Sequence, residues 1–274
     1  MSESNDKEST VEGTINAVSG LVEKVPVYED AIRPLAKETG KALGTVGKTV
    51  NAALMPIRGL VWGMEQIEEF VQTKVTKKLE NVPPENIQTP DPAVAGPAIE
   101  SLRFTGHKES LSDLYANLLA TSMDSTTAKT AHPGFVEIIR NLSGDEAKIL
   151  SHLVKVQVVP LVDIRRESTE GKGGVVVSSY VSTVGHDSGC EHRDLVSTYL
   201  KNLERLGLID IPRDKHLVKE GVYDRILNDP PVKKIEEQLN ALEKHQAKFE
   251  KYYATPSALG ELFISACVNS RDKT

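Results

Sequence analysis

The sequence has few of the residues that mark several common classes of protein. It contains two cysteines, Cys190 and Cys267, which argues against a disulfide framework and favours a reducing compartment. Aromatic residues make up 5% of the chain, so we expect a core built mainly from aliphatic side chains. The formal net charge is −6, and therefore no basic excess indicates a polyanionic partner.

The chain also lacks a long apolar run. A transmembrane helix needs about 20 consecutive apolar residues. The nearest candidate, residues 40–64, is interrupted by Lys41, Lys48 and Arg58. The polar residues 1–10 lack the basic start and apolar stretch of a secretory signal. We therefore expect a cytoplasmic protein, with peripheral contact at the inner face of the membrane left open.

Catalytic motifs are absent as well. The sequence has no Walker loop, no G-x-G-x-x-G after a predicted strand, no H-E-x-x-H and no CxxC pair. His186, Cys190 and His192 could supply three zinc ligands, but no second Cys/His pair stands at the spacing of a structural zinc site. We predict a solvated loop there. We also predict no enzyme activity, no cofactor and no metal site, and no small-molecule substrate is evident.

The composition that remains, 39% hydrophobic and 26% charged, is typical of a folded protein. The patterns along the chain predict a mainly α fold in three parts. Residues 1–12 form a disordered tail, and residues 13–142 form a helical domain with a proline-rich extended strap at 82–97. Residues 143–274 form a winged-helix-like α+β domain with a helical insertion at 212–251.

Small residues gather on one side of the first long predicted helix. Helices with small residues at this spacing can approach one another closely, within a membrane or in a tight bundle. Glycine costs a helix about 0.8–1 kcal/mol relative to alanine, so its repeated use indicates a packing role. The candidate contact residues are Gly40, Gly44, Gly47, Asn51, Gly59 and Gly63, with Trp62 placed to lie at a membrane interface.

Two interpretations of this stripe remain open. The first is a buried contact between helices of the N-terminal domain. The second is a segment that lies on or inserts into a membrane after oligomerisation, with its lysines extended toward the aqueous side. We also expect a protein partner or self-association.

The second half has the element order of a winged helix-turn-helix. Ser143 and Glu146 form a capping box that starts a helix. Two β-branched runs flank a glycine-rich turn at 171–174 and predict a hairpin. The further elements that we expect are a helix at 191–206 closed by Gly207, a strand at 208–211, a helix at 231–251, a strand at 252–254, and a last helix capped by Thr255.

The helix at 191–206 would enter the major groove if this fold read DNA. Arg193, Lys201 and Arg205 are its candidate nucleic-acid contacts. Their charge is offset by Glu191, Asp194 and Glu204, so the helix is close to neutral. A protein contact or a scaffolding role is therefore favoured over contact with nucleic acid.

Several short motifs resemble one known family. They are VPVYEDA at 25–31, GKALGTVGKTVN at 40–51, LVWG at 60–63, LENVPPE at 79–85, TPDP at 89–92, ANLLA at 116–120 and the segment 132–142. With these motifs the chain resembles the abortive infection alpha family over about residues 15–210, while residues 212–251 have no match.

The resemblance implies a role in bacterial defence against phage, by harming or arresting the infected cell. It supplies no catalytic residue, because its matched positions are glycines, prolines and apolar residues. We therefore expect a non-enzymatic anti-phage protein that acts through helical contacts with the membrane or a protein partner. The alternative is a cytoplasmic regulator that binds nucleic acid through its C-terminal winged helix.

Overall fold

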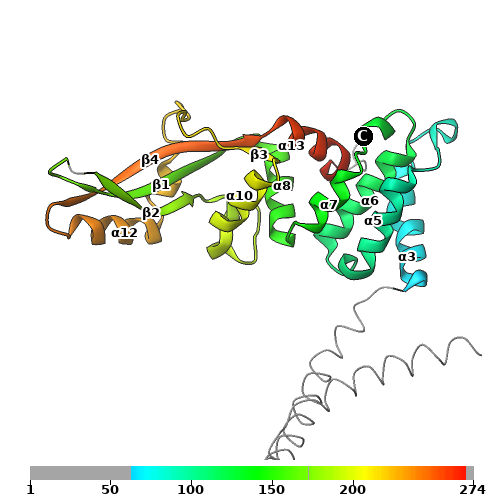
Figure 1. The fold of residues 1–274 in the computed structure, drawn as a ribbon, viewed down its shortest axis with the longest axis horizontal. Coiled ribbons are helices and arrows are strands. Elements are labelled where there is room, and N and C mark those ends of the chain that lie inside the picture. Colours follow the sequence, from blue (N-terminus) through cyan, green and yellow to red (C-terminus); the bar gives the residue numbers. More distant parts are fainter. Residues whose placement is uncertain (1–62, 172, 270–274) are drawn as a thin grey trace, which may run out of the picture. The chain divides into compact units, whose positions relative to one another are not determined.

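A computed structural model of the protein describes residues 63–171 and 173–269, which belong to one compact unit. The fold is mainly helical with one small, curled antiparallel sheet (Figure 1), so the predicted fold class is confirmed at this level. The winged-helix description stays a prediction.

The first helical elements of the described chain are α3 (Met64–Phe70), the π-helical η1 (Val71–Val75), α4 (Thr76–Leu79), η2 (Pro84–Asn86), α5 (Pro92–Thr105), α6 (Glu109–Met123), η3 (Ala128–Thr130), α7 (Gly134–Arg140) and α8 (Gly144–Val156). After the hairpin come α9 (Val184–Asp187), η4 (Arg193–Leu195), α10 (Val196–Arg205), α11 (Asp224–Leu227), α12 (Pro230–Asn240), α13 (Ala258–Phe263) and the π-helical η5 (Ile264–Val268). The strands are β1 (Val159–Ser168), β2 (Gly174–Val181), β3 (Ile209–Asp210) and β4 (His245–Pro256).

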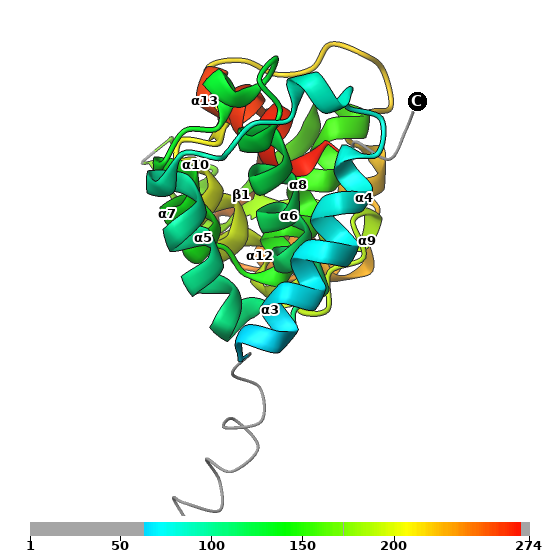
Figure 2. The ribbon, with the colours of Figure 1, turned by 90° about the vertical axis from the view of Figure 1, so that its right-hand side faces the viewer.

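Helix α6 is the centre of the helical part. It contacts α4, α5, α7, α8 and η5, so it is buried on most of its circumference. In Figure 2 the continuous stretch from α3 to α4 runs beside α6. Its large buried side chains are those of Leu111, Leu114, Tyr115, Leu118 and Leu119.

The predicted proline-rich strap at 82–97 is too long. Helix α5 already starts at Pro92, where Asp91 caps it by accepting a hydrogen bond from the N–H of Ala93. Proline is favourable at the first helical position, because the N–H that it lacks would have no intrahelical partner there. Pro97 lies inside the helix at the loss of one hydrogen bond. The burial of Ala98 and its neighbours stabilises this turn in spite of that loss.

The hairpin predicted around residues 171–174 is confirmed. Strands β1 and β2 pair antiparallel, and the sheet has the order β2-β1-β4-β3. Figure 1 shows β1 and β4 running side by side, and their register extends from Val159 opposite Ala254 to Ser168 opposite His245. Strand β2 therefore lies at one edge of the sheet.

The helix predicted at 231–251 is wrong in its second half, and so is the end of the predicted helical insertion at 212–251. Helix α12 ends at Asn240, and β4 begins at His245. The charges at 248–251 fit a solvated helical face locally, but ladder pairing with β1 decides the conformation. Context of this kind overrides local propensity, because propensity differences amount to about 1 kcal/mol or less per residue.

Strand β1 is buried on both faces near its start. Val159 and Leu161 join the large core of the helices, while Val162 and Ile164 join two small clusters under α11 and α12. Successive residues of a strand point to opposite faces, so this run of apolar residues contributes to cores on both sides of the sheet. The large core includes residues from Phe70 to Cys267 and so from both predicted domains.

The helix ends in the second half follow the sequence signals in two of three cases. The capping box of α8 is confirmed by reciprocal hydrogen bonds between Ser143 and Glu146. Gly207, at φ +72°, ends α10 in the left-handed conformation that glycine favours. Thr255 does not cap the last helix. Ser257 caps α13 instead, because β4 continues through Pro256.

Candidate functional site

Two surface features of the described residues have the shape of binding sites. The first is a groove of about 850 Å³ between β2, the start of α10, and α12. Apolar side chains such as Val181 and Ile235 line it together with hydroxyl groups from β2 and Arg193. Mixed apolar and polar linings of this kind are typical of ligand or peptide sites.

Strand β2 leaves the sheet edge exposed beside this groove. Val175, Val176 and Val177 are 58%, 42% and 50% exposed, and the described residues contribute no strand to the outer side of β2. No charged residue occurs from Gly173 to Val181. Natural proteins usually protect such edges with charges, prolines or bulges, since an open edge can pair with another chain.

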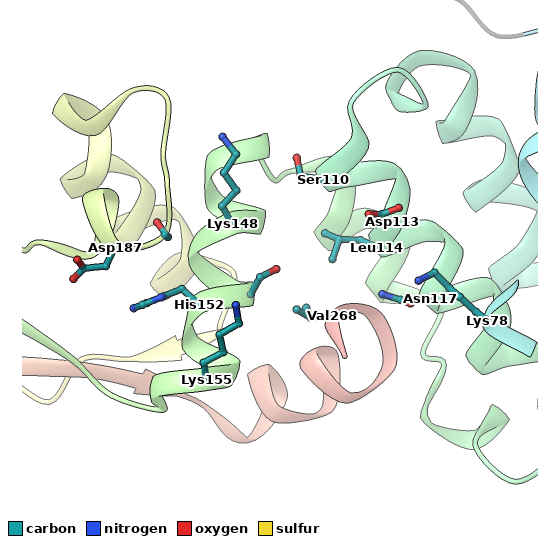
Figure 3. Close-up of a pocket in the computed structure, with 12 residues that line it drawn as sticks. Lys78, Ser110, Asp113, Leu114, Asn117, Lys148, His152, Lys155, Asp187 and Val268 are labelled. Carbon is teal, nitrogen blue, oxygen red and sulfur yellow. The ribbon is translucent and has the colours of Figure 1, made fainter. Parts of the chain in front are cut away.

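The second feature is a polar pocket of about 320 Å³ between α6 and α8, which we call the basic pocket (Figure 3). Helix α8 contributes Lys148, Ser151, His152 and Lys155 to its wall. Helix α6 contributes Ser110, Asp113, Leu114 and Asn117. Lys78, Asp187, Ser188 and Val268 complete the lining.

The carboxylates that line the basic pocket are each paired with a cation that does not line it. Asp113 lies 2.6 Å from the Nζ of Lys74, and Asp187 lies 2.7 Å from a guanidinium nitrogen of Arg225. Lys148 pairs with Asp145 at 2.8 Å. Lys155 makes no hydrogen bond or ion pair with the described residues.

Asn117 lies in the wall of the basic pocket and is 4% exposed. Its Nδ2 donates a hydrogen bond of 2.9 Å to the carbonyl of Cys267, which lies in the last turn of η5. Its Oδ1 accepts no hydrogen bond from the described residues. Buried polar atoms almost always have a partner.

Asp145 joins the start of α8 to the loop before α10. Its carboxylate accepts hydrogen bonds from the N–H groups of Glu191 and His192 at 3.0 and 2.9 Å, and from the hydroxyl of Tyr199. Burial alone would raise the pKa of Asp145. The hydrogen bonds from His192, Lys148 and Glu191 outweigh burial and lower this pKa to about 2.

The same carboxylate affects Tyr199. Burial, with the negative charge of Asp145 beside it, raises the pKa of Tyr199 to about 12. Both groups therefore keep one protonation state at neutral pH, with Asp145 charged and Tyr199 protonated. Their arrangement holds the loop in place and offers no group for proton transfer near pH 7.

A buried polar cluster stabilises the sheet at a β-bulge. Two residues of β2, Ser179 and Tyr180, stand opposite Asp163 of β1, and Tyr180 takes a φ of +58°, which is uncommon for a residue with a side chain. The carboxylate of Asp163 accepts hydrogen bonds from the N–H of Tyr180 and the hydroxyl of Tyr252. Arg213 closes the cluster with a 2.8 Å ion pair to Asp163.

The aromatic rings hold the arginine of this cluster. The guanidinium of Arg213 lies 4.5 Å from the ring centre of Tyr180 and 4.4 Å from that of Tyr252. Burial, followed by the hydrogen bond to Asp163, raises the pKa of Tyr252. The cluster thus ties the connection after β3 to the sheet. A sequence signal for it existed, because Asp163 interrupts an otherwise apolar run.

Most of the predicted small-residue contacts lie outside the described residues. These are Gly40, Gly44, Gly47, Asn51, Gly59 and Trp62. Gly63 is described, and it lies exposed at the start of α3. The helix contact or membrane contact expected of this stripe stays a prediction.

The three predicted nucleic-acid contacts lie on α10 and on η4, which directly precedes it. Arg193 lines the groove. The Nζ of Lys201 lies 5.4 Å from the ring centre of Tyr180, and Arg205 donates two hydrogen bonds to Asn202. Two of the three cations therefore have partners within the chain.

The segment that carries His186, Cys190 and His192 starts in the short helix α9 and is held by local contacts. The Sγ of Cys190 is buried against the hydroxyl of Ser188 and the carbonyl of Asp145, and burial raises the pKa of its thiol. Within residues 63–171 and 173–269, no group of three or more His, Cys, Asp or Glu side chains could hold a metal ion.

The basic pocket was not predicted from the sequence, although a signal for it was present. Polar residues recur on α8 at intervals of three, four and seven residues, which places them on one face. From the sequence alone, such a stripe predicts a helix surface that faces solvent. Only the position of α6 opposite α8 turns it into the wall of a pocket.

Among the helices of residues 63–171 and 173–269, none is long and apolar enough to cross a membrane.

Comparison with known proteins gives one family and one distant structural likeness. A family model described as abortive infection alpha matches residues 63–267. A solved structure of an uncharacterized protein from the hydrocarbon-degrading marine bacterium Alcanivorax borkumensis SK2 is 21% identical over 52% of this chain and 94% of that chain. Its TM-score of 0.35 is too low to carry an argument. No curated protein matches the chain.

Proposed function

The chain belongs to the abortive infection alpha family, and from this premise we propose that it defends a bacterium against phage by harming or arresting the infected cell. The observation that carries the proposal is the family match over residues 63–267. We further propose that the protein acts without catalysis, through contact with a protein partner. Contact with the inner face of the membrane, from a cytoplasmic position, is the other form of this proposal.

The exposed edge at β2 supports a protein partner. The outer side of an edge strand offers N–H and C=O groups at regular spacing, and these are satisfied by another polypeptide strand. The valines at 175–177 and the neighbouring groove would add apolar contacts on both faces of that strand. A lipid surface supplies no such ladder of hydrogen bonds.

Phage plating tests the defence role. Cells with the gene should show a plating efficiency lowered by at least about tenfold for some phages of a broad panel, together with loss of viability of the infected cells. The assay compares the wild-type gene with an empty vector. Unchanged plating and survival across the panel would contradict the defence role.

A pair of variants tests the contact at the β2 edge. The double variant Val175→Lys, Val177→Lys should abolish protection against phage, because two charges on the edge of the sheet block pairing with another strand. Val218→Lys is the control, since Val218 is 92% exposed and belongs to no strand. Equal thermal stability of the variants would show that folding is unchanged. Full protection by the double variant would exclude the edge as the contact.

Nucleic-acid binding through a winged helix is the second candidate function. The observation that favours it is the succession of α8, α10 and the antiparallel pair β3–β4, which is the element order of that fold. It predicts binding to duplex DNA that weakens linearly in log[salt]. Substitution of Arg193, Lys201 and Arg205 by alanine should then weaken binding to duplex DNA. Absence of binding to any duplex at low salt would exclude this function.

A further inference from the structure

Strand β2 is exposed only along its first half. The side chains of Val175, Val176 and Val177 are exposed, whereas that of Tyr180 is buried. At this far end the strand packs against α10, where the hydroxyl of Tyr180 donates a hydrogen bond of 2.8 Å to Glu204. Another strand can therefore reach β2 only along the stretch around Val176.

The ladder between β1 and β2 decides which backbone groups of this stretch point outward. The N–H of Ser168 donates a hydrogen bond to the carbonyl of Gly173. Two residues further along β2, Val175 stands opposite Arg166 in the same register. Successive residues of an antiparallel ladder direct their backbone groups alternately toward the neighbouring strand and away from it. The backbone groups of Gly173 and Val175 therefore face β1, and the N–H and C=O of Val176 point away from it.

The side chains of this stretch are suited to pairing with an identical strand. When two copies of one strand pair antiparallel about a twofold axis, a charged residue near the axis would stand close to its own copy and repel it. Strand β2 contains no charged residue. With the axis at Val176, this valine stands opposite itself, and Val175 stands opposite Val177 of the second copy. The three exposed valines thus pack against one another, as β-branched residues do well in a sheet.

The opposite edge of the sheet limits such an assembly to two chains. Strand β3 consists of Ile209 and Asp210 alone, so it offers almost no ladder to another strand. Pairing through β2 therefore covers the one long open edge of the described sheet. A contact between identical surfaces about a twofold axis closes after two copies, whereas a contact between two different edges can continue into a fibre.

We propose that two copies of this chain pair through β2, antiparallel about a twofold axis at Val176. The N–H and C=O of Val176 exchange two hydrogen bonds with those of the same residue in the second copy. The two sheets then form one continuous sheet that ends in β3 on both sides. This inference rests on the proposed contact at the β2 edge, and it names the partner as a second copy of the chain.

Sedimentation equilibrium of the purified full chain tests the pairing. The average mass of the wild type should rise with concentration from that of one chain toward twice that value. Val176→Pro should stay a monomer, because proline removes the outward N–H at the centre of the pair and leaves the ladder to β1 intact. Val175→Pro is the matched control, since it removes an N–H that faces β1. In dilute solution it should lower the melting temperature by clearly more than Val176→Pro does.

Disulfide formation locates the axis. The Cα atoms of a hydrogen-bonded antiparallel pair lie about 5.5 Å apart, which a disulfide can span. Val176→Cys should therefore give a covalent dimer on mild oxidation, and reduction should reverse it. The native Cys190 and Cys267 are both buried, so they do not compete. The control Val218→Cys, at a position that is 92% exposed and belongs to no strand, should cross-link at least about tenfold more slowly, because random collision replaces a held geometry.

A concentration-dependent dimer that is lost in Val176→Pro and cross-linked at residue 176 supports the proposal. A wild type that stays a monomer up to about 0.5 mM overturns it, because a specific pair would associate at that concentration. A dimer that Val176→Pro leaves unchanged, or equal rates of cross-linking at residues 176 and 218, overturns the β2 edge as the contact.

Failure of this inference and failure of the proposed function give different results. Suppose that the wild type is a monomer and that the lysine double variant at Val175 and Val177 still loses protection against phage. The β2 edge then pairs with a different protein, which overturns self-pairing and keeps the proposed contact. A wild type that forms the dimer but gives no protection keeps self-pairing and contradicts the defence role.

Discussion

The helices around α6 and the sheet region of β1, β2, β4 and α12 are stabilised in different ways. Around α6, apolar side chains such as Leu118 and Phe135 are almost completely buried in one large cluster. The sheet has only two small clusters on its outer face, and its centre holds the polar contacts of Asp163. Apolar burial is the main source of stability in the first region. Hydrogen bonds and ring contacts contribute a larger share of the stability in the sheet region.

The two regions also offer different surfaces to a partner. The sheet region exposes a strand edge with three valines and a groove beside it. The helical region encloses a polar pocket rich in lysine. The two surfaces therefore differ in chemistry, with an open backbone edge in the sheet region and polar and charged side chains in the helical region.

Removal of a core side chain should have the largest effect. Leu118→Ala leaves a cavity at the centre of α6 and should lower the free energy of unfolding by about 3 kcal/mol. Urea unfolding followed by circular dichroism measures it. Leu195→Ala, at a position that is 42% exposed, is the control and should cost well under half as much. Equal effects of the two variants would contradict burial as the main source of stability.

The matching test in the sheet region is Asp163→Ala. It leaves the hydroxyl of Tyr252 without its acceptor and the guanidinium of Arg213 without its carboxylate partner, and we expect a loss of about 2 kcal/mol. The loss should be local. Hydrogen exchange should become faster in β2 while the amides of α6 stay protected. If hydrogen exchange becomes equally faster in β2 and in α6, the sheet region and the helices around α6 are not stabilised independently.

The pH dependence of Asp145 tests the junction between α8 and the loop before α10. Its pKa is about 2 in the folded protein against an ordinary value of 3.8. A lowered carboxyl pKa stabilises the folded state above the unfolded pKa, and this contribution is lost as pH falls from 4 toward 2. A shift of this size corresponds to about 2 kcal/mol.

Unfolding measured across that pH window should show a smaller decline in Asp145→Asn than in the wild type. Asp214→Asn, at an exposed position without described contacts, should retain the wild-type slope. Identical slopes in all three proteins would show that the hydrogen bonds to Asp145 do not stabilise the fold.

Loss of the helix cap should have the smallest effect. Ser143→Ala removes one half of the capping box of α8 and should cost about 1 kcal/mol, whereas Ser143→Thr should be close to neutral. Thermal unfolding of the three proteins measures the difference. An alanine variant as stable as the wild type would mean that the packing of α8 makes its cap redundant.

Local sequence signals were sufficient to predict many helices and strands of both regions. The capping box at Ser143, the glycine-rich turn of the hairpin and Gly207 each act within a few residues, so they can be read from the chain directly. The predictions that proved wrong concern long-range pairing or packing. The residues at 245–251 form a strand because β1 lies beside them. Residues 92–97 form a helix because its face is buried.

The sequence by itself determined the mainly helical class, the family and the hairpin, since periodicity and turn chemistry are local properties. The tertiary structure alone decided that the polar faces of α6 and α8 enclose a pocket, that Asn117 lies in its wall, and that Asp163 meets Arg213 across 50 residues. These contacts join residues that are distant along the chain. Their energies depend on burial and geometry, which no short window of sequence contains.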